Sequence, residues 1–110
     1  MTSNEYQQEA LRTAGVRQTK AEQLAEGVMG LSGEAGECID ILKKHLFQGH
    51  DLDKKEMALE LGDVAWYLAI SAWSIGYELD DIFEMNIEKL RKRYPDGFEA
   101  WRSVHREERH

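Results

Sequence analysis

The stretch ELGDVAWYLAISAWSI, residues 60–75, decides the fold. Residues 64–75 carry no charge and are apolar on nearly every side of a helix, without the strict alternation typical of a strand. A helix of this kind belongs at the centre of a bundle or in a subunit interface. Because Glu60 and Asp63 come directly before the run, the same helix also places negative charge close to the core.

Helices are expected on both sides of this stretch, since the chain has one proline and its turn signals are well separated. A loop is expected at residues 48–50, and the sequence Tyr94-Pro95-Asp96-Gly97 should stop the last long helix, with one short helix at 98–104. We predict an all-α chain with helices over about 4–13 (cap Asn4), 20–47 (from Thr19 or Lys20), 51–75 (cap Asp51 or Asp53, ended by Gly76) and from Asp80 and Asp81 to Arg93.

Four glycines interrupt the predicted second helix at intervals of three residues: Gly27, Gly30, Gly33 and Gly36. Each weakens a helix by up to about 1 kcal/mol relative to alanine, so their presence requires a reason. The favoured interpretation is that they let another helix or a ligand approach the backbone closely. The alternative is that the helix breaks near Ser32.

Composition limits the possible functions. A chain of 110 residues with 42% hydrophobic content is expected to form one domain, residues 1–110. Its 14 basic and 21 acidic residues give a net charge of −7, which argues against binding nucleic acid or an anionic membrane through overall charge. No run approaches the ~18 apolar residues of a membrane span, and the single cysteine, Cys38, favours a reducing compartment. We therefore expect a cytoplasmic protein.

Two pairs of acidic residues carry the candidate chemistry. Glu34 and Glu37 are three apart on the second helix, as Glu60 and Asp63 are on the third, so each pair projects from one helix face. The short connection makes the two helices antiparallel, and the pairs can then face each other. At ~4 Å each pair of anions repels by ~1–4 kcal/mol. None of the four has a lysine or arginine three or four residues away, so a bound cation is the expected solution.

A site made of carboxylate oxygens suits Mg²⁺ or Mn²⁺, whereas zinc would normally recruit cysteine or histidine. Magnesium often keeps coordination positions for substrate phosphates, so phosphate chemistry is the natural use. A single acidic pair is common on a solvated helix face, but two pairs on adjacent core-forming helices favour a functional site.

The predicted fourth helix carries Asn86, Lys89 and Arg93 on one face, where they could hold phosphates. The alternative is that its basic residues only complement the negative end of the helix dipole. Tyr67 lies one turn beyond Asp63 and is a candidate for contacting a ribose or base, although a buried packing role is the commoner case.

These motifs together resemble the MazG-like nucleoside triphosphate pyrophosphohydrolases, over roughly residues 27–98. The resemblance is carried by GEAGE at 33–37, ELGD at 60–63, NIEKL at 86–90 and RYP at 93–95, in the order and with separations typical of the family. It implies an all-α, four-helix-bundle-like fold and Mg²⁺-dependent hydrolysis of a (d)NTP to (d)NMP and pyrophosphate, in a nucleotide house-cleaning role.

The resemblance also assigns residues. It makes Glu34, Glu37, Glu60 and Asp63 metal ligands and catalytic residues, and Tyr67, Asn86, Lys89 and Arg93 substrate contacts. It further implies a homodimer or homotetramer. One departure concerns Gly33, where many relatives place a second glutamate that can serve as general base. Either a metal-bound water attacks the substrate without a separate base, or Glu34 or Glu37 serves both as metal ligand and as base.

Two other interpretations remain open from the sequence. The chain could be a non-enzymatic helical module whose acidic surface recruits a basic partner. It could also be a ferritin-type redox protein, although the Glu-x-x-His pairs of such proteins are missing.

Overall fold

The computed structural model of the chain describes residues 1–15 and 19–97. These residues form the helices α1 (Ser3–Leu11), α2 (Lys20–Phe47), α3 (Lys54–Ser74) and α4 (Leu79–Arg93), and no strand occurs among them. The predicted all-α class is therefore confirmed. The chain divides into two compact units, Met1–Leu79 and Asp80–His110, so the single domain over 1–110 stays a prediction. The short helix expected at 98–104 lies outside the described residues.

The first two helices begin with the same device, a capping box. Thr2 Oγ1 accepts from the backbone N–H of Glu5 at 3.1 Å, and Glu5 Oε1 accepts from the Thr2 N–H at 2.9 Å. Thr19 and Glu22 repeat the arrangement at the start of α2. The predicted cap Asn4 is thus wrong, because the capping box at Thr2 satisfies two otherwise unpaired N–H groups two residues earlier in the chain.

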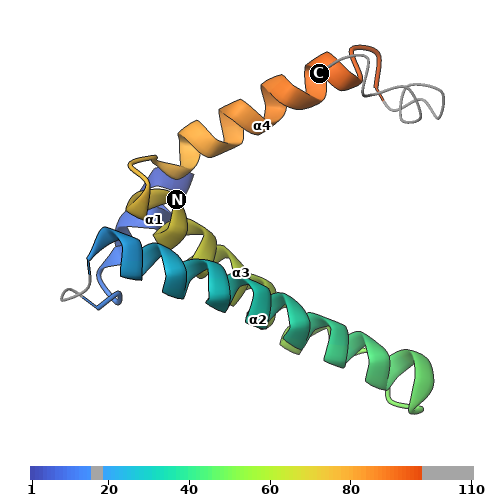
Figure 1. Cartoon of the computed structure of the whole chain (residues 1–110). Helices are drawn as coiled ribbons and strands as arrows, with labels where there is room; N and C mark the ends of the chain where they lie inside the picture. Colours follow the sequence, from blue (N-terminus) through green and yellow to red (C-terminus); the bar gives the residue numbers. More distant parts are fainter. Residues whose placement is uncertain (16–18, 98–110) are drawn as a thin grey trace. The chain divides into compact units, whose positions relative to one another are not determined.

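Helices α2 and α3 lie side by side (Figure 1) and form an antiparallel hairpin with a short connection. Of the two predicted caps for α3, the structure uses Asp53, whose Oδ1 accepts from the Glu56 N–H at 2.9 Å. Gly49 in the connection and Gly76 after α3 both have positive φ, 75° and 87°, a conformation that glycine adopts without strain. The predicted end of α3 at Gly76 is confirmed.

The first two of the four glycines in α2 allow the hairpin to close. A Cβ on Gly30 would overlap the ring of Tyr67, and one on Gly27 would overlap the hydroxyl of Ser71. Helix α2 is continuous, so the alternative of a break near Ser32 is wrong. Close approach of the two helices is confirmed at these two positions.

The next two glycines differ. A Cβ on Gly33 or Gly36 would meet nothing within 4 Å in the described part of the chain. Close approach therefore does not account for Gly33 or Gly36 within this one chain.

Helix α1 is joined to the end of α3 by one buried side chain. Gln7 is fully buried, and its Nε2 donates to the carbonyls of Ala69 at 3.0 Å and Tyr77 at 3.2 Å. Its Oε1 accepts from the Leu79 N–H at 3.0 Å. Ala69, Ile70 and Ala72 are also buried, so this part of the predicted uncharged run lies in the core. Three hydrogen bonds satisfy this amide where water does not reach it.

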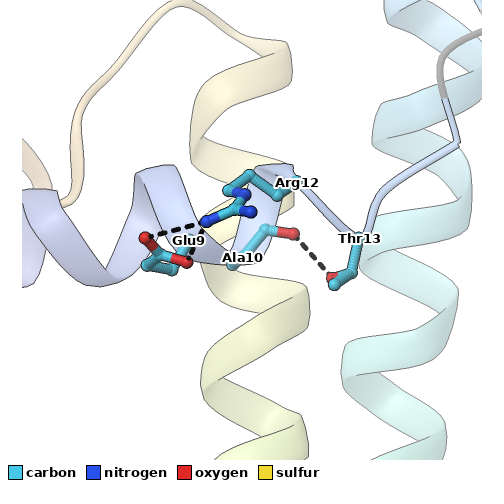
Figure 2. A network of polar contacts seen from close by, with 4 residues as sticks. All are labelled: Glu9, Ala10, Arg12 and Thr13. Atoms are coloured by element: carbon cyan, nitrogen blue, oxygen red, sulfur yellow. Dashed lines mark hydrogen bonds and ion pairs between the residues drawn. The ribbon is translucent and has the colours of Figure 1, made fainter.

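The end of α1 makes a second connection to α3. Figure 2 shows Arg12 Nη1 paired with Glu9 at 3.1 Å and Thr13 Oγ1 donating to the Ala10 carbonyl at 2.8 Å. The same Thr13 hydroxyl accepts from Trp66 Nε1 at 2.8 Å. Both hydrogen bonds of the hydroxyl are short, so the end of α1 has a defined place against α3.

The second unit contains the rest of α4, whose first turn carries Asp80 and Asp81 and whose last turn carries three basic residues. This charge order complements the helix dipole, as predicted. Gly97, with φ of 86°, donates from its N–H to the Tyr94 carbonyl at 3.0 Å in the predicted stop. None of the helices in the described part of the chain is long and apolar enough to cross a membrane.

Candidate metal centre

Three of the predicted carboxylates meet between α2 and α3. Glu34 of α2 and Glu60 and Asp63 of α3 each offer an oxygen, and these atoms all lie within 4.8 Å of one another. The two residues of α3 reach the same place because a spacing of three brings side chains to one face. Glu34 and Glu60 are half-buried, whereas Asp63 is exposed. The cluster thus has a sheltered side and an open side.

The electrostatics of Glu60 are unfavourable without a cation. Its Oε2 is buried and has no hydrogen-bond partner among the described residues, since ionised carboxylates cannot donate to one another. The pKa of Glu60 is raised, first because a proton on it can be shared with Glu34, then by burial and by the charges of Glu34 and Asp63. The ion pairs described within Met1–Leu79 join Arg12 to Glu9 and Lys43 to Asp40, and neither includes a residue of the cluster.

This donor set fits a hard divalent ion. All the ligand atoms are carboxylate oxygens, which Mg²⁺ and Mn²⁺ prefer, and a cation would supply the missing partner of the buried Oε2. It would also remove the repulsion that raises the pKa of Glu60. The cluster is therefore a candidate metal centre that one antiparallel helix pair positions.

Glu37, the fourth predicted ligand, is exposed and is not among the three clustered carboxylates. It lies one turn beyond Glu34 on α2. The other two clustered carboxylates, Glu60 and Asp63, come from α3. Its role as a ligand stays a prediction.

Tyr67 is a half-buried packing residue in this structure. Its ring fills the space beside Gly30 and meets the Trp66 ring edge to face, with centroids 4.9 Å apart and planes at 88°. It also lines a small cavity together with Glu26 and Ile70. A contact with the sugar or base of a substrate stays a prediction.

The other predicted substrate contacts, Asn86, Lys89 and Arg93, lie on α4 in the second unit. Asn86 and Lys89 are exposed. Arg91 Nη1, by contrast, pairs with Glu88 at 2.9 Å. The substrate roles of the first three stay predictions.

One residue near the cluster was not predicted from the sequence. The hydroxyl of Tyr6 in α1 donates to the Gly62 carbonyl at 3.4 Å, one residue before Asp63. Burial raises the pKa of Tyr6, and the charge of Asp63 adds to this effect. The two partners are 56 residues apart in sequence, and no local pattern links them.

The fold and the site define an all-α protein with a carboxylate cluster suited to a divalent cation. Residues 22–98 match the family model of the MazG nucleotide pyrophosphohydrolase domain, and the chain belongs to this family. The chain is 35% identical over 80 residues to the gene 37 protein of Mycobacterium phage L5, a match that covers 69% of this chain and 70% of the phage protein. No solved structure matches significantly.

Proposed function

We propose that the chain hydrolyses a (d)NTP at the α–β phosphate linkage, giving (d)NMP and pyrophosphate, with Mg²⁺ as cofactor and Mn²⁺ as a possible substitute. The observation that carries the proposal is the buried, unpartnered Oε2 of Glu60 beside Glu34 and Asp63, in a chain of a nucleotide pyrophosphohydrolase family. A cation resolves that arrangement, and triphosphates are ligands that bind through such a cation.

In this proposal Glu34, Glu60 and Asp63 hold the ion, with Glu37 as the further carboxylate one turn along α2. When bound, the ion supplies charge neutralisation for the phosphates and makes water a better nucleophile. Gly33 has no side chain to act as base, so the proton of the attacking water passes to solvent or to one of the carboxylates.

The remaining contacts extend the proposal to the rest of the substrate. Asn86, Lys89 and Arg93 share one face of α4 by their spacing and would bind the phosphates. Tyr67 would contact the sugar or base. The proposed role is house-cleaning of the nucleotide pool in the cytoplasm, without a nucleic-acid or membrane partner.

The hairpin also supports the proposed homodimer or homotetramer. Val28, Ile39, Leu42 and Leu46 recur along one side of α2, and their exposed fractions range from 42% to 65%. Leu61 of α3 is 55% exposed. Exposed apolar side chains at helical spacing are typical of a surface that another helix covers. A second copy would bury them and complete a four-helix bundle.

The test is release of pyrophosphate and monophosphate from a panel of canonical and modified (d)NTPs with Mg²⁺. We expect Asp63→Asn to lower turnover at least about 100-fold, since it removes an ionised oxygen ligand. Glu37→Gln tests the fourth ligand in the same assay. Glu56→Gln, the same loss of charge on an exposed residue one turn before Glu60, is the matched control and should stay active.

Pyrophosphate release by the wild type, with loss in Asp63→Asn only or in both ligand variants, would support the proposal. No turnover of any triphosphate would contradict it. In that case an acidic module that binds a basic partner would become the better interpretation. Mg²⁺ would then raise the melting temperature no more than an equal ionic strength of NaCl does.

A further inference from the structure

The first helix lies outside the stretch that matches the family model, residues 22–98, and yet it contacts Gly62, next to the ligand Asp63. Its contribution there is Tyr6, which none of the assigned roles includes. An inference about Tyr6 rests on the proposed cation site, although its test does not require turnover.

Two anchors fix the position of Tyr6 in α1. The next residue, Gln7, is fully buried and joined by three hydrogen bonds to the end of α3 and the start of α4. At the other end of α1, Thr13 accepts from Trp66 Nε1 at 2.8 Å. A helix held at both points against α3 cannot slide or rotate freely, so the half-buried phenol is held against Gly62.

The contact of Tyr6 is with the turn of α3 that carries two of the three ligands. Its hydroxyl donates to the Gly62 carbonyl, between Glu60 and Asp63 in sequence. Burial raises the pKa of Tyr6, and the charge of Asp63 adds to this effect, which agrees with the position of the phenol beside Gly62. The phenol is therefore an uncharged donor at the edge of an acidic cluster, and it adds no negative charge there.

We propose that Tyr6 is a positioning residue for the metal centre: its hydroxyl holds the Gly62–Asp63 turn of α3 so that Asp63 faces the other two ligands. It is not a catalytic residue, because it acts through Asp63. Glycine at 62 makes this restraint useful, since glycine is the least stable residue in a helix interior apart from proline. An external hydrogen bond limits local distortion at that position.

The test compares Tyr6→Phe with the wild type in Mn²⁺ binding, followed by electron paramagnetic resonance of free Mn²⁺. Phenylalanine keeps the ring and removes only the hydroxyl. We expect the Kd for Mn²⁺ to rise about threefold, at the lower end for one lost hydrogen bond because the 3.4 Å distance is long. Tyr77→Phe is the matched control, since only its backbone carbonyl takes part in the contact with Gln7.

The melting temperature in EDTA reports any loss of packing in the metal-free protein, whereas the Kd for Mn²⁺ reports the positioning of Asp63. An unchanged Kd for Tyr6→Phe overturns the proposal, whether or not the melting temperature falls. An equal rise of Kd in Tyr77→Phe overturns it too. If the wild type binds Mn²⁺ without hydrolysing any (d)NTP, the proposed function fails, but the comparison of Kd values still decides the role of Tyr6. If the wild type binds no Mn²⁺, the cation site and the role of Tyr6 both fail.

Discussion

Two pairs of glycines in α2, Gly27 with Gly30 and Gly33 with Gly36, have the same spacing but different surroundings. Gly27 and Gly30 are filled by side chains of α3, whereas Gly33 and Gly36 meet nothing in the described chain. The reason is geometric: residues three apart turn by about 300° in an α-helix, so nine residues shift a side chain by about 180°. Gly36 therefore lies on the opposite side of α2 from Gly27. A run of equally spaced small residues does not make one continuous contact.

The largest change in stability is expected when a side chain is added at Gly30, where α3 approaches α2 closely. In Gly30→Ala the new Cβ overlaps three atoms of the Tyr67 ring, whose neighbour Trp66 restricts its escape. Overpacking of this kind costs about 3 kcal/mol at its upper range, and the better helix propensity of alanine returns at most about 1 kcal/mol. We expect the melting temperature to fall by roughly 10 °C in calorimetry. An unchanged value would mean that the hairpin is looser than the structure shows.

A smaller change, this time an increase in stability, is expected when a charge is removed from the carboxylate cluster. The pKa of Glu60 is raised, first through the hydrogen bond with Glu34, so between the ordinary glutamate pKa and the raised value the metal-free folded protein binds more protons than the unfolded chain. The contribution of this group to stability is present below the ordinary glutamate pKa and is lost as pH rises through the raised value. Glu60→Gln should therefore raise the melting temperature in EDTA at neutral pH and flatten the decline of the melting temperature as pH rises above the ordinary glutamate pKa.

The control for this change is Glu56→Gln, which removes a charge outside the cluster. Addition of Mn²⁺ should stabilise the wild type and Glu56→Gln but not Glu60→Gln, which has lost a ligand. If Glu60→Gln lowered the metal-free stability, the repulsion inferred for the cluster would be wrong.

The smallest change in stability is expected at Gly36, which has no close neighbour in the described chain. Gly36→Ala adds a Cβ that meets nothing within 4 Å in the described chain, so only helix propensity changes. We expect a gain of up to about 1 kcal/mol, measured by urea unfolding. A loss of stability would instead show that another molecule covers this part of α2, and a dependence of that loss on protein concentration would identify the molecule as a second copy.

Local signals in the sequence predicted most of the fold. The bounds of α2, the stop at Gly76 and the antiparallel hairpin all follow from patterns a few residues long, which also limit the cap of α3 to Asp51 or Asp53. The meeting of Glu34, Glu60 and Asp63 follows from them, because two short spacings on paired helices fix it. Such arguments work when one helix contact is enough to define the geometry.

Other features depend on contacts that no local pattern encodes. Tyr6 reaches Gly62 because α1 docks against α3, and the residues that dock it are a glutamine and a threonine, which look like surface residues in the sequence. Glu37 differs from Glu34 only by its place on the helix, which decides whether it enters the cluster or faces solvent. Both distinctions need the tertiary arrangement.

The fully buried Gln7 affects which fragment of this protein can fold on its own. The family match begins at residue 22, but a fragment cut there would leave the Ala69 carbonyl and the Leu79 N–H without the amide that pairs with them. The unit that similarity detects is thus smaller than the unit that can close its own interior. A graft of residues 22–98 onto another scaffold would have to bring α1 along, or supply from the host an amide that replaces Gln7.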